Sequence, residues 1–99
     1  MVKIVWTEAS TRDLKQIFDF IAEDSKRYAI ITVNQVYHNA QMISDNPMIG
    51  RVVPEFNEKS IREVLSGNYR IIYRIKSKLQ VDILRVFHTS RLLKKNKLY

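Results

Sequence analysis

Basic side chains in the second half of the chain are the residues best suited to chemistry or binding. Arginines recur there within and beside apolar runs, and one of them, Arg62, directly precedes an acid. A guanidinium stays charged and forms bidentate hydrogen bonds with phosphate or carboxylate groups. The arginines that we expect to contact an anionic target are Arg51, Arg70, Arg74, Arg85 and Arg91.

The charge of the chain is divided unevenly between its halves. The chain has a net charge of +7. Residues 1–49 hold five Lys/Arg and six Asp/Glu, whereas residues 50–99 hold twelve and four, so the second half carries +8. Such asymmetry is typical of proteins that bind nucleic acid or an acidic protein. The alternative is a basic surface that only keeps the protein from associating.

Two histidines and one glutamate are the remaining candidates for proton transfer. His88 closes the last apolar run, and imidazole titrates near neutrality, although a single histidine at a strand end is more often structural. His38 lies on the charged flank of a predicted helix, and we expect no role for it. Glu55 follows Pro54 in a loop. It can act as a base, pair with Arg62 or be solvated, and we favour a non-catalytic role.

Common metal, cofactor and membrane signals are missing from the sequence. The absence of cysteine excludes a thiolate metal site, and the two histidines share no ligand spacing. Two glycines do not make a phosphate-binding loop. No run approaches the roughly 18 apolar residues of a membrane span, and the N-terminus lacks the core of a signal peptide. We expect no metal, no cofactor, no membrane association and a cytoplasmic location.

The first half of the chain predicts a strand followed by two helices. Alternation favours a strand over 2–6. Apolar residues spaced three and four apart predict helices over about 8–23 and 27–45. Thr7 can cap the first helix, and Pro47 ends the second because proline disfavours helical geometry in its predecessor.

The second half predicts three antiparallel strands in a single domain, 1–99. After a loop over 48–59, runs rich in Val, Ile and Tyr predict strands over about 61–66, 69–76 and 80–88, joined by two short turns. In the middle strand, Arg70 and Arg74 share one face, which we expect to point outward. The opposite face should meet the helices. The predicted core is Leu14, Ile17, Phe18, Ile21, Val33, Val36, Ile71, Tyr73 and Ile83.

Four segments together resemble the RelE/ParE superfamily of bacterial toxins. They read DLKQIFDFIAEDS, NPMIGRVVPEF, IREVLSGNYRIIYRI and VDILRVFHTSR, and the resemblance spans about Trp6 to Leu93. Such proteins are the toxin halves of type II toxin–antitoxin modules, often described as plasmid stabilisation proteins. The resemblance implies an α+β fold of order β-α-α-β-β-β, in which an N-terminal strand and helical hairpin pack on an antiparallel sheet. It also implies a cognate antitoxin, for which the +8 half suits an acidic, partly disordered segment.

Members of the superfamily differ in their targets. The NPMIGRVVPEF and YRIIYRI segments look more like ParE, which implies growth inhibition by poisoning DNA gyrase. The alternative is a RelE-like endoribonuclease that cuts messenger RNA on the ribosome. In that case Arg62 would bind phosphate, Glu55 would be the base and His88 the acid. The central lysines of several RelE enzymes are missing here, with only Lys59 nearby. A second alternative is a non-toxic nucleic-acid-binding module.

Overall fold

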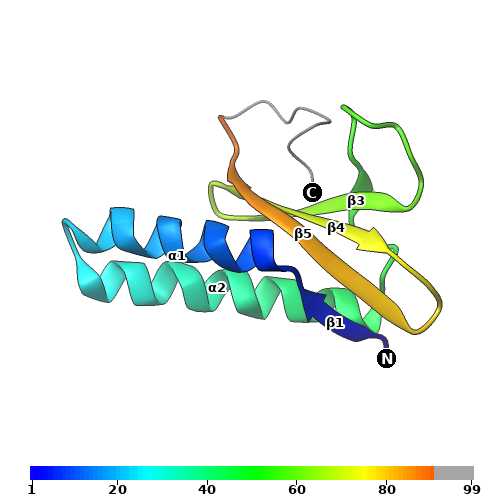
Figure 1. Ribbon diagram of the computed structural model, residues 1–99, viewed down its shortest axis with the longest axis horizontal. Helices are drawn as coiled ribbons and strands as arrows, with labels where there is room; N and C mark the ends of the chain where they lie inside the picture. Colours follow the sequence, from blue (N-terminus) through cyan, green and yellow to red (C-terminus); the bar gives the residue numbers. More distant parts are fainter. Residues whose placement is uncertain (91–99) are drawn as a thin grey trace.

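The computed structural model describes residues 1–90 of the chain, so Arg91, one of the arginines expected to contact the target, lies outside the described part. Two helices and five strands follow one another in this part (Figure 1). They are β1 (Lys3–Trp6), α1 (Glu8–Ala22), α2 (Lys26–Asp45), β2 (Arg51–Val52), β3 (Ile61–Ser66), β4 (Tyr69–Ile75) and β5 (Gln80–His88).

The strands form one mixed sheet in the order β1-β5-β4-β3-β2. β3, β4 and β5 pair antiparallel as predicted, and β1 lies parallel to β5 at one edge. The short strand β2, which the sequence did not indicate, pairs with the beginning of β3 at the other edge. The predicted α+β class, with a helical hairpin on the sheet, is confirmed.

Side-chain caps start both helices. The Thr7 hydroxyl accepts a hydrogen bond from the Ser10 amide and donates to the Ile83 carbonyl at 2.7 Å, so it also ties the start of α1 to β5. The Ser25 hydroxyl accepts from the Tyr28 amide at the start of α2. These bonds satisfy amide groups that have no partner within the helix.

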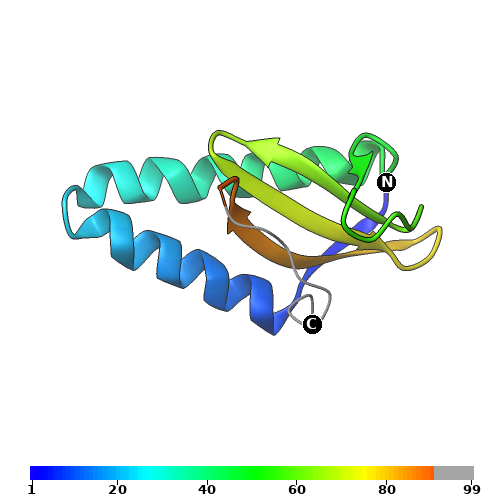
Figure 2. The same cartoon turned by 90° about the horizontal axis from the view of Figure 1, so that it is seen from above.

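Both helices lie on one face of the sheet, as Figures 1 and 2 show from two directions. Their inner stripes meet β4 and β5 in the main core. Its buried members are Leu14, Val36, Ala40, Ile43, Ile71, Tyr73, Val81, Ile83 and Val86. Burying such side chains is the principal stabilising contribution to the fold.

Four predicted core residues are only half-buried. Ile17 still packs against the main core, whereas Phe18, Ile21 and Val33 are not among the side chains packed against it. The reason is the shape of the molecule, because the turn between α1 and α2 extends past the end of the sheet (Figure 1). There the helices cover only each other, and Phe18 and Val33 line a shallow surface hollow. The prediction that these three residues belong to the buried core is therefore wrong.

Tyr73 and Gly50 join the main core to the loop that follows α2. The Tyr73 hydroxyl donates to the Pro47 carbonyl at 2.7 Å and accepts from the Gly50 amide at 2.9 Å. A Cβ atom at Gly50 would lie 2.6 Å from this hydroxyl and 2.5 Å from the Glu63 carbonyl oxygen. Only glycine therefore fits at this position without displacing β3 or Tyr73.

Candidate functional site

The sheet face turned away from the helices carries a second, smaller apolar cluster. Its buried members are Val53, Ile61, Ile72, Leu84 and Phe87. Phe56 packs against them, so the loop between β2 and β3 lies against this face. We call it the outer face. The prediction that the face carrying Arg70 is open to solvent is therefore wrong.

Glu63 is the centre of a buried ion-pair network on the outer face. Its carboxylate accepts from Nε of Arg51 and from Nε of Arg70, each at 2.6 Å. Arg70 also forms a bidentate pair with Glu55, at 2.8 and 2.9 Å. Two carboxylates thus neutralise two guanidiniums. We refer to Glu55, Glu63, Arg51 and Arg70 as the Glu63 network.

Burial in this network decides what each arginine can do. The hydrogen bonds from Arg70 to Glu55 raise the pKa of Arg70, and they outweigh the opposing effect of burial. Arg70 is only 7% exposed. It cannot reach an anionic target without breaking its bonds to Glu55 and Glu63. The Arg51 side chain, by contrast, is 66% exposed and remains accessible.

A second buried carboxylate joins α1 to β5. Asp13 accepts from Nε and Nη2 of Arg85 at 2.7 and 2.9 Å, and from the Val86 amide at 2.9 Å. These bonds raise the pKa of Arg85. The Arg85 guanidinium also lies 4.5 Å from the centre of the Phe87 ring. Arg85 therefore holds the end of β5 against the helix, a structural role in addition to the predicted target contact.

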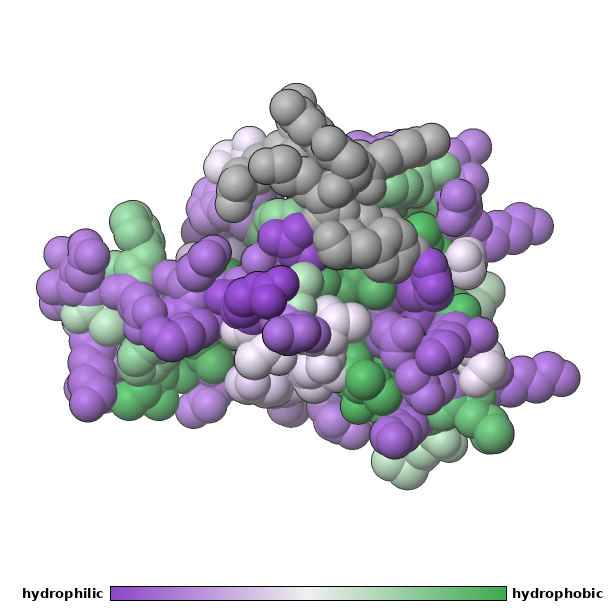
Figure 3. Space-filling view, viewed as in Figure 1, coloured by the Kyte–Doolittle hydropathy of each residue, from purple (hydrophilic) through white to green (hydrophobic). Residues whose placement is uncertain are grey.

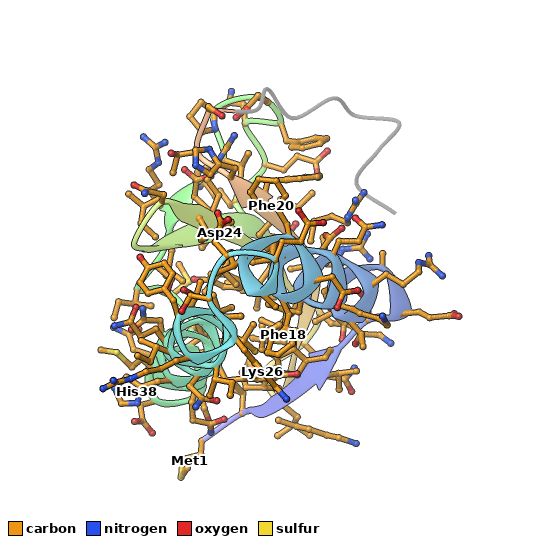
Figure 4. The ribbon with its side chains drawn as sticks, turned by 90° about the vertical axis from the view of Figure 1, so that its left-hand side faces the viewer. Met1, Phe18, Phe20, Asp24, Lys26 and His38 are labelled. Atoms are coloured by element: carbon orange, nitrogen blue, oxygen red, sulfur yellow. The ribbon has the colours of Figure 1, made fainter. Side chains whose placement is uncertain are left out.

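An apolar hollow of about 410 Å³ lies between α1 and the end of β5. Ile17 and Phe20 line it from the helix, and Tyr69 and His88 line it from the sheet. The rings of Tyr69 and His88 meet edge to face, with centroids 5.6 Å apart. Phe20 is 74% exposed and lies on the opposite side of α1 from Phe18 (Figure 4). An exposed aromatic beside an apolar hollow is typical of a protein-binding surface.

The three candidate nuclease residues do not come together. Arg62 lies opposite Tyr73 in the sheet, and His88 lies opposite Tyr69. These partners are four residues apart on β4, which places Arg62 and His88 about 13 Å apart along the strand direction alone. Both point to the helix side, whereas Glu55 pairs with Arg70 on the outer face.

The bonds of Arg62 differ from those of a phosphate ligand. Its Nε donates to the Lys59 carbonyl and its Nη1 to the Gly50 carbonyl, each at 2.9 Å. Arg62 therefore ties the residue before β2 to the end of the loop between β2 and β3. Arg74 is half-buried and lies between Ile61 and Asp82 in the register of the sheet.

Sequence reasoning missed Glu63 and Asp13 as ion-pair partners. In the sequence Asp13 stands beside charged residues of α1, which gives no sign that it is only 7% exposed. A signal for Glu63 was present in the uninterrupted apolar run Ile71-Ile72-Tyr73, because a strand apolar on both faces is buried on both faces. With the outer face covered, arginines on it require buried carboxylates.

Residues 1–90 show no feature of a metal site or of a membrane-spanning helix. No group of three or more His, Cys, Asp or Glu in this part could hold a metal ion. Neither helix of the described part has the length and apolar character needed to cross a bilayer. What the site offers is therefore charge and apolar surface.

The fold and the site define a small, basic α+β domain with an apolar hollow at the end of its last strand. A sequence model of the ParE toxins of type II toxin–antitoxin systems, parDE, matches residues 4–93. The chain therefore belongs to this family of toxins, which confirms the resemblance seen in the sequence.

Solved structures of related proteins share the fold. A chain from the chromosomal ParDE toxin–antitoxin system of P. aeruginosa superposes with a TM-score of 0.73 at 20% identity, covering 89% of this chain and 96% of that one. A chain of the toxin–antitoxin complex RelBE2 from Mycobacterium tuberculosis gives 0.64 at 25% identity, covering 88% and 96%. No curated protein sequence matches the chain significantly.

Proposed function

We propose that this chain is a growth-inhibiting toxin that poisons DNA gyrase in the cytoplasm and is silenced by a cognate acidic antitoxin. Membership of the ParE family is the observation that carries the proposal. The separation of Arg62, Glu55 and His88 supports poisoning by binding over RNA cleavage. Cleavage through the 2′-hydroxyl needs a base, an acid and a cation within hydrogen-bond reach of one phosphate.

Purified gyrase and translating ribosomes provide the direct test of the target. We expect the purified chain to inhibit supercoiling of relaxed plasmid and to increase gyrase-linked DNA breaks, while messenger RNA on ribosomes stays intact. His88→Ala should leave this activity largely unchanged, because His88 is exposed and a binding toxin needs no acid at this position. If the wild type cuts messenger RNA and His88→Ala does not, this proposal is wrong. The chain would then be a RelE-like endoribonuclease.

The hollow between α1 and β5 is the best candidate for the antitoxin surface. The M. tuberculosis relative was solved as a toxin–antitoxin complex. Among residues 1–90, β1 pairs with β5 only as far as Ile83, and the end of β5 has no second neighbouring strand from this part of the chain. An apolar hollow beside a sheet edge suits an amphipathic segment that folds as it binds.

Substitution of Phe20 separates silencing from toxicity. Phe20→Ser should weaken antitoxin binding about 30-fold or more, the loss typical of an aromatic anchor. The variant should stay folded and toxic, because Phe20 is largely exposed. Met42→Ser, at an exposed site on α2, is the matched control and should be silenced normally. Equal silencing of both variants by the antitoxin encoded beside the gene would place the antitoxin elsewhere.

A further inference from the structure

Two groups of basic residues in the described part of the second half have different surroundings. The first group is engaged within the protein, because Arg51, Arg70 and Arg85 each pair with a carboxylate. The second group consists of lysines that are exposed and form no ion pair with any residue among 1–90. Together with Lys3 from the first strand they make what we call the lysine cluster: Lys3, Lys59, Lys76 and Lys78.

Backbone pairing brings the lysine cluster together at one end of the sheet. Lys76 and Lys78 lie in the turn between β4 and β5. The Lys3 amide donates to the Leu79 carbonyl at 2.9 Å, which places β1 beside this turn. Lys59 precedes Ser60, whose carbonyl accepts from the amide of Ile75, the last residue of β4, at 2.8 Å. Residues from three separate segments therefore surround one turn.

This turn lies at the far end of the molecule from the helical hairpin turn. Figures 1 and 2 both show the turn between β4 and β5 projecting at that end, and hydrophilic side chains extend there in Figure 3. Leu79 lies at the tip and is 76% exposed. The tip is thus the turn Lys76-Ser77-Lys78-Leu79, with β1 and the segment before β3 on its two sides, and it presents a leucine among lysines.

Like charges so close together need a physical reason. Lys76 and Lys78 lie two residues apart in one turn, and the Debye length at physiological salt is about 8 Å, so their positive charges repel each other. An anionic partner would convert this repulsion into attraction. Phosphates at regular spacing along a nucleic acid suit a cluster of lysines, which act as point charges.

We propose that the lysine cluster binds duplex DNA, with the β4–β5 turn against a groove and the lysines on flanking phosphates. The major groove admits elements as wide as an α-helix or a two-stranded ribbon, and apolar side chains such as leucine contact bases in the grooves or wedge between them in proteins that deform DNA. The tip Lys76-Ser77-Lys78-Leu79 contains no Arg, Asn or Gln, the side chains that most often read bases. Binding should therefore be independent of DNA sequence. This DNA binding requires no gyrase and goes beyond the proposed action on that enzyme.

Binding of the full chain to a labelled 20-base-pair duplex at several salt concentrations tests this proposal. Lys76→Gln with Lys78→Gln should weaken binding at least tenfold at 100 mM salt and lower the slope of log affinity against log salt by about 2. The matched control is Lys26→Gln with Arg27→Gln, which removes the same charge at the helical hairpin, where Figure 4 shows Lys26. We expect the control to retain affinity within about threefold. Circular dichroism and thermal melting establish that both variants are folded.

Leu79→Ser tests the apolar contact of the tip with DNA, an effect that charge alone does not produce. It should weaken binding severalfold while the salt slope stays unchanged, because a serine removes apolar contact but no phosphate contact. Equal losses in the tip variant and the hairpin control would overturn the proposal, since net charge would then explain the binding. Tighter binding to single-stranded RNA than to the duplex, or competition only by acidic polypeptide, would overturn it in favour of those partners.

Discussion

The two faces of the sheet are stabilised by different interactions. The main core under the helices is mostly aliphatic, and Tyr73 within it satisfies its hydroxyl with the backbone at Pro47 and Gly50. The outer face combines a small apolar cluster with the Glu63 network. On the helix side of the described part, the buried charges are confined to the Asp13–Arg85 pair that joins α1 to β5, whereas the outer face, covered by one loop, carries a larger network of charges that neutralise each other. The predictions below test this difference.

Removing Glu63 should have the largest effect. Glu63→Ala leaves Arg70 buried with only Glu55 as a partner, and breaking a buried ion pair in this way costs roughly 3–5 kcal/mol. Urea unfolding of the variant measures the loss in the free energy of unfolding. Glu8→Ala is the control, because its pair with Arg12 is exposed and should contribute less than about 1 kcal/mol. Similar losses in both variants would mean that the outer face does not depend on its ion pairs.

Gly50→Ala tests the junction between the two faces. The added methyl group would overlap the Tyr73 hydroxyl and the Glu63 carbonyl, both within 3 Å. Overpacking of this kind costs roughly 1–3 kcal/mol. Thermal unfolding should record a lower midpoint. Gly67→Ala is the comparison, because a Cβ atom there meets nothing within 4 Å. Any loss of stability in Gly67→Ala therefore reflects the positive φ of Gly67 and not crowding. Wild-type stability in Gly50→Ala would contradict the tight contact.

Tyr73→Phe tests the polar group of the covered face. It removes one acceptor and one donor from buried backbone groups, which should cost about 1–2 kcal/mol. Burial raises the pKa of Tyr73 above 10. Above about pH 10 the Tyr73 hydroxyl therefore loses its proton in the unfolded state but keeps it in the folded state. The unfolded state is stabilised by this ionisation, so Tyr73 lowers the free energy of unfolding as pH rises above about 10. Unfolding curves at pH 9 and 11 should show a smaller decline in Tyr73→Phe than in the wild type.

Phe18→Ala should have the smallest effect. Phe18 is half-buried where the hairpin extends past the sheet, so we expect a loss of about 1 kcal/mol, below the 3–5 of a fully buried Phe. Ile83→Ala in the main core is the comparison and should lose roughly 2–5 kcal/mol. A larger loss in Phe18→Ala than in Ile83→Ala would mean that the hairpin end contributes as much as the sheet.

Local patterns in the sequence account for most of the fold. Helical spacing, the Thr7 cap and the two turn signals predicted every helix and the three long strands to within one or two residues. These features depend on neighbours within a few positions, which is why they can be read from the sequence. The strand β2 was missed because two residues carry no periodicity.

The placement of charges was decided by contacts between distant residues. The sequence by itself determined that the second half is basic and that arginines recur along the sheet. Only the tertiary structure decided that Arg70 and Arg85 pair with Glu63, Glu55 and Asp13. It also separated Arg62 from His88. The physical reason is that periodicity sets which face a side chain takes within its own element. The burial of that face, and hence the need for a carboxylate partner, depends on the loop and helix that cover it.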